Sequence, residues 1–188
     1  MPTRVPDITR RTSFASAASW FVRNPTATKS GSVSRLDASM MALSAGSVAS
    51  TVSWGFEAGS APAGITRIVA AVSGRTFENM AVFGALGAAG AFAKLSMSID
   101  ELSPNGSFVR RLTNVPTTIF DSGWPAYIGY IIGASNTRSS VIGIPVVARN
   151  RYVVWVNLQQ AAAAAGFGPS AVSNCAFDFG PVFFVFSN

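Results

Sequence analysis

The feature that most constrains this chain is an alternation of apolar and polar residues with a period of two. From Leu95 to Ile99, large apolar residues occupy every second position and serines lie between them. Successive side chains of a β-strand point to opposite faces, so the pattern predicts a strand with one buried and one solvated face. Three further segments show the same pattern, at residues 52–57, 152–159 and 175–179.

Turn-forming residues separate these segments. Asn and Gly tolerate positive φ and Pro presets its own φ, so clusters of them favour reversals of the chain. Such clusters lie at 103–106, 121–123, 133–136 and 149–150. Short strands without a long helical pattern indicate a sandwich or barrel. We expect an all-β fold of nine or ten strands, an antiparallel β-sandwich of jelly-roll-like topology with an extended N-terminal arm. An immunoglobulin-like sandwich is the alternative.

The N-terminal region differs in composition from the rest of the chain. Residues 1–35 hold six of the 14 basic residues but one of the eight acidic residues, and they are rich in Ser and Thr. One apolar stripe between Phe14 and Phe21 has helical spacing, and Pro25 would end that helix. We predict that residues 1–47 form a basic, Ser/Thr-rich arm whose short helix forms by docking. Residues 48–188 are predicted to form the jelly-roll-like sandwich domain.

Two segments do not follow the alternating pattern at all. Five alanines at 161–165 are too few to hold a helix in water, and we predict that they connect two strands. The segment 182–186 is apolar at every position. A strand that is apolar on both sides must be covered on both faces. It is therefore either a central strand beneath the chain's own loops or part of a subunit contact.

Low charge favours the subunit contact. Only 12% of the residues are charged, against about 25% in ordinary soluble domains, so neighbouring molecules are expected to cover part of the surface. The candidate subunit-interface residues are Phe183, Phe184, Phe186, Phe14, Trp20 and Phe21. We expect a homo-oligomer or contacts with other subunits of an array. No stretch of about 20 strongly apolar residues predicts a membrane span.

Composition excludes several kinds of chemistry. The chain has no histidine and one cysteine, Cys175. It therefore lacks a Ser-His-Asp triad, a His-ligated zinc site and an intrachain disulfide. We expect no cofactor, no metal site and no enzymatic activity.

The acidic residues favour structural roles. Asp100 and Glu101 are adjacent, so on a strand they point to opposite faces and form no catalytic pair. They are expected to end a strand before the turn at 103–106. Asp178 lies between two phenylalanines, and a buried carboxylate needs a cationic partner. Arg149 and Arg151 are the partners that we expect.

Two sets of residues are candidates for ligand binding. Arginine suits phosphate, and neighbouring aromatic rings can stack on bases, so the arm predicts a weak nucleic-acid contact. Its candidate polyanion-binding residues are Arg4, Arg10, Arg11 and Arg23. Aromatic residues near amides are also typical of glycan-binding faces. The candidate glycan-binding residues are Trp124, Tyr127 and Trp155.

Two functional hypotheses follow. The first is a structural, self-assembling subunit of a virus or phage particle, as a capsid, decoration or tail-associated protein, or of an extracellular filament or array. The protein would then be located in a virion or an extracellular assembly. The alternative is a carbohydrate-binding or adhesive β-sandwich module.

Overall fold

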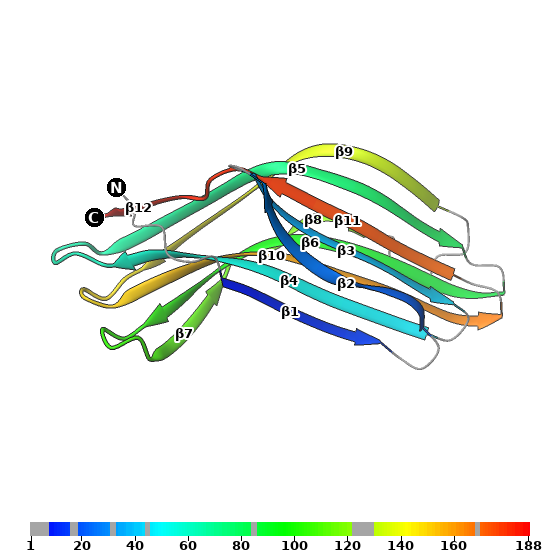
Figure 1. Cartoon of the computed structure of the whole chain (residues 1–188), viewed down its shortest axis with the longest axis horizontal. Coiled ribbons are helices and arrows are strands. Elements are labelled where there is room, and N and C mark those ends of the chain that lie inside the picture. Colours follow the sequence, from blue (N-terminus) through cyan, green and yellow to red (C-terminus); the bar gives the residue numbers. More distant parts are fainter. Residues whose placement is uncertain are drawn as a thin grey trace.

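The structure, a computed structural model, describes residues 8–15, 19–30, 33–43, 46–83, 86–121, 130–167 and 170–188. Twelve β-strands in these ranges form two antiparallel sheets packed as a sandwich (Figure 1). The strands are β1 (Ile8–Ala15), β2 (Ser19–Ser30), β3 (Val33–Leu43), β4 (Gly46–Ser60), β5 (Arg67–Phe83), β6 (Leu86–Leu102), β7 (Phe108–Thr113), β8 (Thr117–Asp121), β9 (Tyr130–Pro145), β10 (Arg151–Phe167), β11 (Ser170–Phe179) and β12 (Phe183–Ser187).

The strands pair in a nested order. The first sheet has the order β1-β4-β10-β6-β7, and β8 pairs with β6 beyond the end of β7. The second sheet has the order β12-β5-β11-β3-β2, and β9 pairs with the other edge of β5. Thus β3 pairs with β11, β4 with β10, β5 with β9, and β6 with both β7 and β8. Nested pairing that alternates between two sheets is the jelly-roll topology, so the predicted all-β antiparallel sandwich of jelly-roll-like topology is confirmed.

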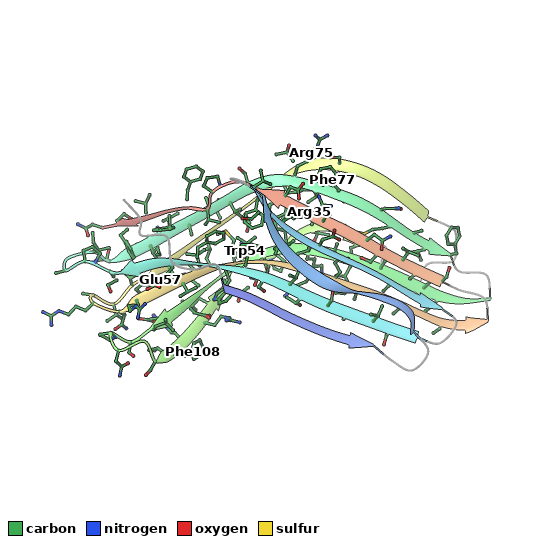
Figure 2. The ribbon with its side chains drawn as sticks, in the orientation of Figure 1. Arg35, Trp54, Glu57, Arg75, Phe77 and Phe108 are labelled. Atoms are coloured by element: carbon green, nitrogen blue, oxygen red, sulfur yellow. The ribbon has the colours of Figure 1, made fainter. Side chains whose placement is uncertain are left out.

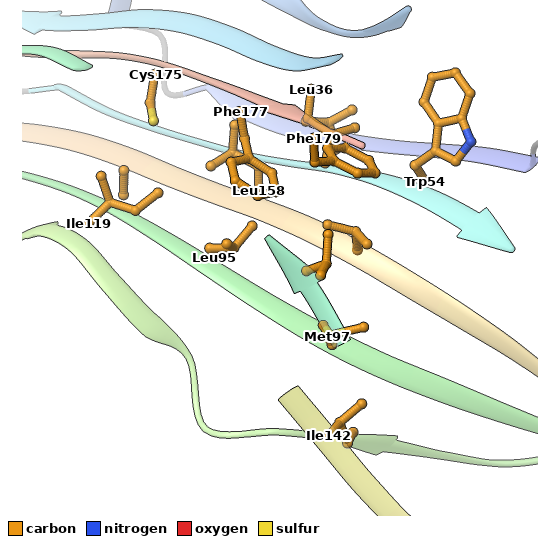
Figure 3. Packing of buried hydrophobic residues seen from close by; sticks show 14 of the residues in the cluster. Leu36, Trp54, Leu95, Met97, Ile119, Ile142, Leu158, Cys175, Phe177 and Phe179 are labelled. Atoms are coloured by element: carbon orange, nitrogen blue, oxygen red, sulfur yellow. The ribbon is translucent and has the colours of Figure 1, made fainter. Parts of the chain in front are cut away.

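The core lies between the inner faces of the two sheets. Leu95 and Leu158 of the first sheet meet Phe177 and Phe179 of the second, and all four side chains are buried (Figure 3). The four segments with the alternating pattern lie in β4, β6, β10 and β11, and one alternating set of apolar residues from each segment lies in the core. The burial of these apolar side chains is the main favourable contribution to folding.

Strands that the sequence pattern did not reveal lie within the predicted arm. β1 pairs with β4 at the edge of the first sheet, and β3 lies between β11 and β2 in the second. The described parts of residues 1–47 therefore belong to the sandwich rather than extending from it. The expected helix is wrong for the described residues, because Phe14 lies in β1 and Phe21 in β2. Pairing with a sheet edge satisfies the backbone there, whereas a short helix would be marginal.

The alanine run is part of a central strand, not a connection. Residues 161–164 of β10 pair with β4 on one side and with β6 on the other. Ala162 and Ala164 are buried beside Ala91 and Ala89 of β6, which are buried as well. Backbone pairing along both edges overrides the weak strand preference of alanine, so propensity gave the wrong prediction.

The C-terminal strand β12 has two different faces. Phe184 and Phe186 pack against the core, and the ring of Phe186 meets the ring of Tyr152 edge-on with 6.2 Å between centroids. Phe183 and Val185 point outward and are 67% and 61% exposed. Within the described residues β12 pairs with β5 alone, so it is not a central strand beneath loops.

Gly74 provides a stability test of this packing. Its Cα faces the stacked rings of Phe177 and Phe179, whose centroids are 5.2 Å apart. A methyl group added at Gly74 would collide with the carbonyl oxygen of Asp178 and lie 2.8 Å from a ring carbon of Phe177 and 2.8 Å from Cβ of Phe179. We expect Gly74→Ala to lower the free energy of unfolding by about 1–3 kcal/mol, measured by urea denaturation. Gly180→Ala, where nothing lies within 4 Å of the added methyl group, is the control and should change little.

Candidate functional site

Paired charges occupy the end of β6. Asp100 and Glu101 are each 2% exposed, and they face the two arginines of β7 across the turn. The Nε of Arg111 donates to Oδ1 of Asp100 at 2.5 Å, and its Nη2 donates to Oδ2 at 2.6 Å. The Nε of Arg110 donates to Oε2 of Glu101 at 2.5 Å. The two carboxylates end the strand and point to opposite faces, as predicted.

Glu101 points into the interior of the sandwich. Its Oε1 accepts hydrogen bonds from Nδ2 of Asn150 and from the hydroxyl of Tyr152, both at 2.9 Å. Burial by itself raises the pKa of Glu101, but the bonds from Asn150, Arg110 and Tyr152 outweigh it and hold the pKa below its usual 4.5. Burial also raises the pKa of Tyr152 to about 12. This arrangement stabilises a buried charge and offers no unpaired acid or base.

Asp100 lies on the outer face of the first sheet together with Trp155. The indole Nε1 of Trp155 donates to Oδ2 of Asp100 at 2.9 Å, and its ring lies directly over Gly55. Trp155 is 2% exposed. A sugar needs an accessible aromatic face, so the prediction that Trp155 binds glycans is wrong. The alternating sequence pattern placed Trp155 on the outer face of the sheet. The pattern does not reveal whether other residues cover that face.

The remaining described carboxylates also have cationic partners. Asp178 pairs with Arg35 at 3.1 Å, and the expected partners Arg149 and Arg151 are wrong, because β3 lies next to β11. Arg35 also lies 3.5 Å from Asp37. The other ion pairs are Glu57–Arg151, Glu78–Arg138 and Asp121–Lys94. Each described carboxylate therefore lies within 4 Å of a cation. No group of three potential metal ligands occurs in the described ranges.

An apolar patch lies on the outer face of the second sheet, across β12, β5 and β9. We define it by five residues: Phe183, Val185, Val69, Ala71 and Val141. Phe183 is the register partner of Ala71, which is in turn the partner of Val141. Val185 is the partner of Val69. Phe183, Val185 and Val141 are 67%, 61% and 60% exposed.

The patch continues to an unpaired sheet edge. One edge of β5 pairs with β9 along its length, and the other edge is shared by β11 and β12. β11 pairs on its far side with β3, but no strand of the described residues pairs with the far side of β12. An apolar strand with an open edge favours association with another chain.

The structure covers the predicted site residues unevenly. Phe183 is exposed in the patch, whereas Phe184 and Phe186 face the core. Three of the predicted residues lie outside the described ranges, and for six others the structure describes the backbone but not the side chain. These residues are Arg4, Trp124 and Tyr127 in whole, and the side chains of Arg10, Arg11, Phe14, Trp20, Phe21 and Arg23. The polyanion contact of the arm therefore stays a prediction.

Stability in acid tests the Glu101 network. Because the pKa of Glu101 is lowered on folding, the unfolded chain takes up this proton first as the pH falls below about 4.5. The stability contributed by Glu101 is thus present above that pH and is lost as the pH falls through the folded-state pKa. We expect Glu101→Gln to lower the free energy of unfolding near neutral pH by about 1–3 kcal/mol. As the pH is lowered further, the stability of this variant should fall less steeply than that of the unmodified chain.

Urea denaturation at a series of pH values measures this effect. Asp121→Asn is the control, because Asp121 is half exposed and its ion pair contributes little. If Glu101→Gln loses stability in acid as steeply as the unmodified chain, the network does not act as described.

Comparisons with known proteins identify no family. No family model and no curated protein sequence matches the chain. Within the described residues, no helix has the length and apolar character needed to cross a membrane.

Three solved structures are similar at low identity. The enzymatically active domain of tailspike protein 4 of bacteriophage CBA120 has a TM-score of 0.33 and 11% identity, over 95% of this chain and 19% of that one. TmCBM61 in complex with β-1,4-galactotriose has a TM-score of 0.29 and 12% identity, over 87% and 88%. Infectious bursal disease virus, Gx strain, has a TM-score of 0.24 and 10% identity, over 95% and 43%.

The chain spans about a fifth of the tailspike structure. Similarities at this level carry no argument about fold or activity. The chain is a two-sheet antiparallel β-sandwich module.

Proposed function

We propose that this chain is a structural subunit of a virus or phage particle, or of an extracellular filament or array, and that it self-assembles through the apolar patch. The carrying observation is the joint exposure of Phe183, Val185 and Val141 on one sheet face. Contiguous apolar patches on a folded domain are typical of protein contacts. Full burial of one such side chain contributes about 1.5–3 kcal/mol, so covering three of them is a substantial driving force.

A second copy of the chain fits this patch because all five side chains that define it are apolar. None of these five side chains is ionisable, and the neighbouring charge on this face is the guanidinium group of Arg67, which lies over Gly143 of β9. An isologous contact buries the same patch on both copies. The open edge of β12 lies beside the patch, and two such edges from two copies can pair with each other. Low overall charge agrees with a surface that neighbours cover.

The alternative carbohydrate-binding or adhesive function loses one of its three predicted residues, because Trp155 is buried. No described contact favours that function at the predicted positions. Absence of enzymatic activity and location in a virion or extracellular assembly remain parts of the proposal for assembly.

Replacing a central residue of the patch tests the proposal. We expect Val185→Ser to weaken self-association about tenfold or more, because the contact loses apolar area and gains a hydroxyl. Sedimentation velocity and native mass spectrometry over a range of concentrations measure the change. Circular dichroism checks that the variant stays folded, which the 61% exposure of Val185 leads us to expect.

Val109→Ser is the matched control. Val109 is 51% exposed, but it lies in β7 at the edge of the first sheet. We expect the Val109→Ser variant to self-associate as strongly as the unmodified chain. An unmodified chain that stays monomeric at high concentration contradicts the proposal, as does equal weakening by the two substitutions.

A further inference from the structure

The outer face of the second sheet changes character along β5. The half nearest to β12 carries the apolar patch, but beyond Ser73 the outward side chains are mainly polar. They come from β5 and from the neighbouring β9, and all of them are exposed. These residues are Ser73, Arg75, Phe77 and Asn79 of β5, with Ser135, Thr137 and Ser139 of β9.

Phe77 is the aromatic centre of this polar half. Its side chain is 40% exposed, and two guanidinium groups approach its ring (Figure 2). The Cζ atoms of Arg35 and Arg75 lie 5.5 and 5.6 Å from the ring centroid, within the range of cation–π contacts. Arg35 comes from β3 and Arg75 from β5, so the fold brings the three side chains together.

Further contacts hold the two arginines in place. The Nε of Arg75 donates to the hydroxyl of Ser135 at 2.5 Å. The Nη1 of Arg35 donates to both carboxylate oxygens of Asp178 at 3.1 Å, and its Nε lies 3.5 Å from Asp37. Side chains that are already ordered lose less conformational entropy when a ligand binds.

The charges of the Phe77 cluster, which we define as Phe77, Arg35, Arg75, Asp37 and Asp178, balance. Two guanidinium groups face two carboxylates, so the cluster has no formal net charge. No carboxylate of the described residues lies within 4 Å of Arg75, so its terminal nitrogens remain available as donors. Asp178 is 26% exposed and offers acceptors next to them. Neither a polyanion nor a polycation is favoured by such a surface.

Donors, acceptors and an exposed aromatic ring on a neutral surface match the chemistry of a neutral sugar. We propose that the Phe77 cluster binds a neutral saccharide. The C–H face of a pyranose ring packs against the exposed part of Phe77. Sugar hydroxyls accept hydrogen bonds from Arg75 and donate to Asp178. The exposed serine and threonine hydroxyls of β9 extend the site along the sheet.

A protein partner fits this half of the face less well. Interface cores are rich in large apolar side chains and poor in serine, whereas this region holds Phe77 among hydroxyl and amide side chains. The apolar patch has the opposite composition. The saccharide site and the proposed assembly contact thus use different residues, and neither depends on the other.

Affinity electrophoresis tests the saccharide site. The full chain runs through native gels that contain galactomannan, xylan, mixed-linkage β-glucan or, as the acidic probe, polygalacturonate. We expect at least one neutral polysaccharide to retard the chain. That retardation should persist when NaCl is raised from about 0.05 to about 0.5 M, because no net charge is involved.

Phe77→Ala and Arg75→Gln should each weaken that binding about tenfold or more. Phe83→Ala is the matched aromatic control, because Phe83 is 44% exposed on the same face of the same strand. Arg67→Gln is the matched arginine control on that face, eight positions from Arg75. We expect both controls to bind as the unmodified chain does.

Four outcomes overturn the proposal. They are the absence of retardation by any neutral polysaccharide, retardation by polygalacturonate alone with loss in salt, equal losses in Phe77→Ala and Phe83→Ala, and loss of binding in Val185→Ser. The last outcome would place the site in the assembly rather than in one chain. Retention of binding by a monomeric Val185→Ser supports the saccharide site.

Discussion

Backbone pairing along both edges of β10 is the constraint on which the rest of the first sheet depends. From residue 151 to 164 this strand has partners in β4 on one side and β6 on the other. Every backbone donor and acceptor of a central strand needs such a partner, because water does not reach it. The pairing fixes the register, and the register decides which side chains face the core. It places Tyr152 inside beside Glu101, and Trp155 outside beside Asp100.

The same constraint explains why charge can be buried at the end of the sandwich. Adjacent residues of a strand face opposite sides, so Asp100 and Glu101 are separated by the sheet itself. Arg111 and Arg110 of β7 likewise point to opposite faces of the sheet. Each carboxylate therefore meets an arginine on its own face. A buried carboxylate without such a partner would cost several kcal/mol. The ion pairs are therefore part of how this hairpin folds, and they leave no free acid for chemistry.

Sequence alone predicted what depends on local alternation. The sandwich, the inward residues of β6 and the opposite faces of Asp100 and Glu101 follow from a period of two. The remaining features depend on which strands become neighbours. Arg35 meets Asp178 because β3 pairs with β11, although the two residues are far apart in the chain. The Phe77 cluster was missed for the same reason. The alternating pair Arg75 and Phe77 was visible in the sequence, but the other members of the cluster lie in two other strands, β3 and β11.

The second sheet carries an asymmetry that nested pairing does not remove. β11 and β12 lie end to end along one edge of β5, interrupted at 180–182. β3 covers the far side of β11 but not that of β12. The edge strand of this sheet is therefore β12, whose residues 183–186 are apolar and uncharged. Natural sheets usually place charges or bulges at such an edge. An edge of this kind is stable in water when another strand or surface covers it. For this reason the apolar half of the face points to a neighbour, whereas the polar half around Phe77 can stay exposed on a single chain.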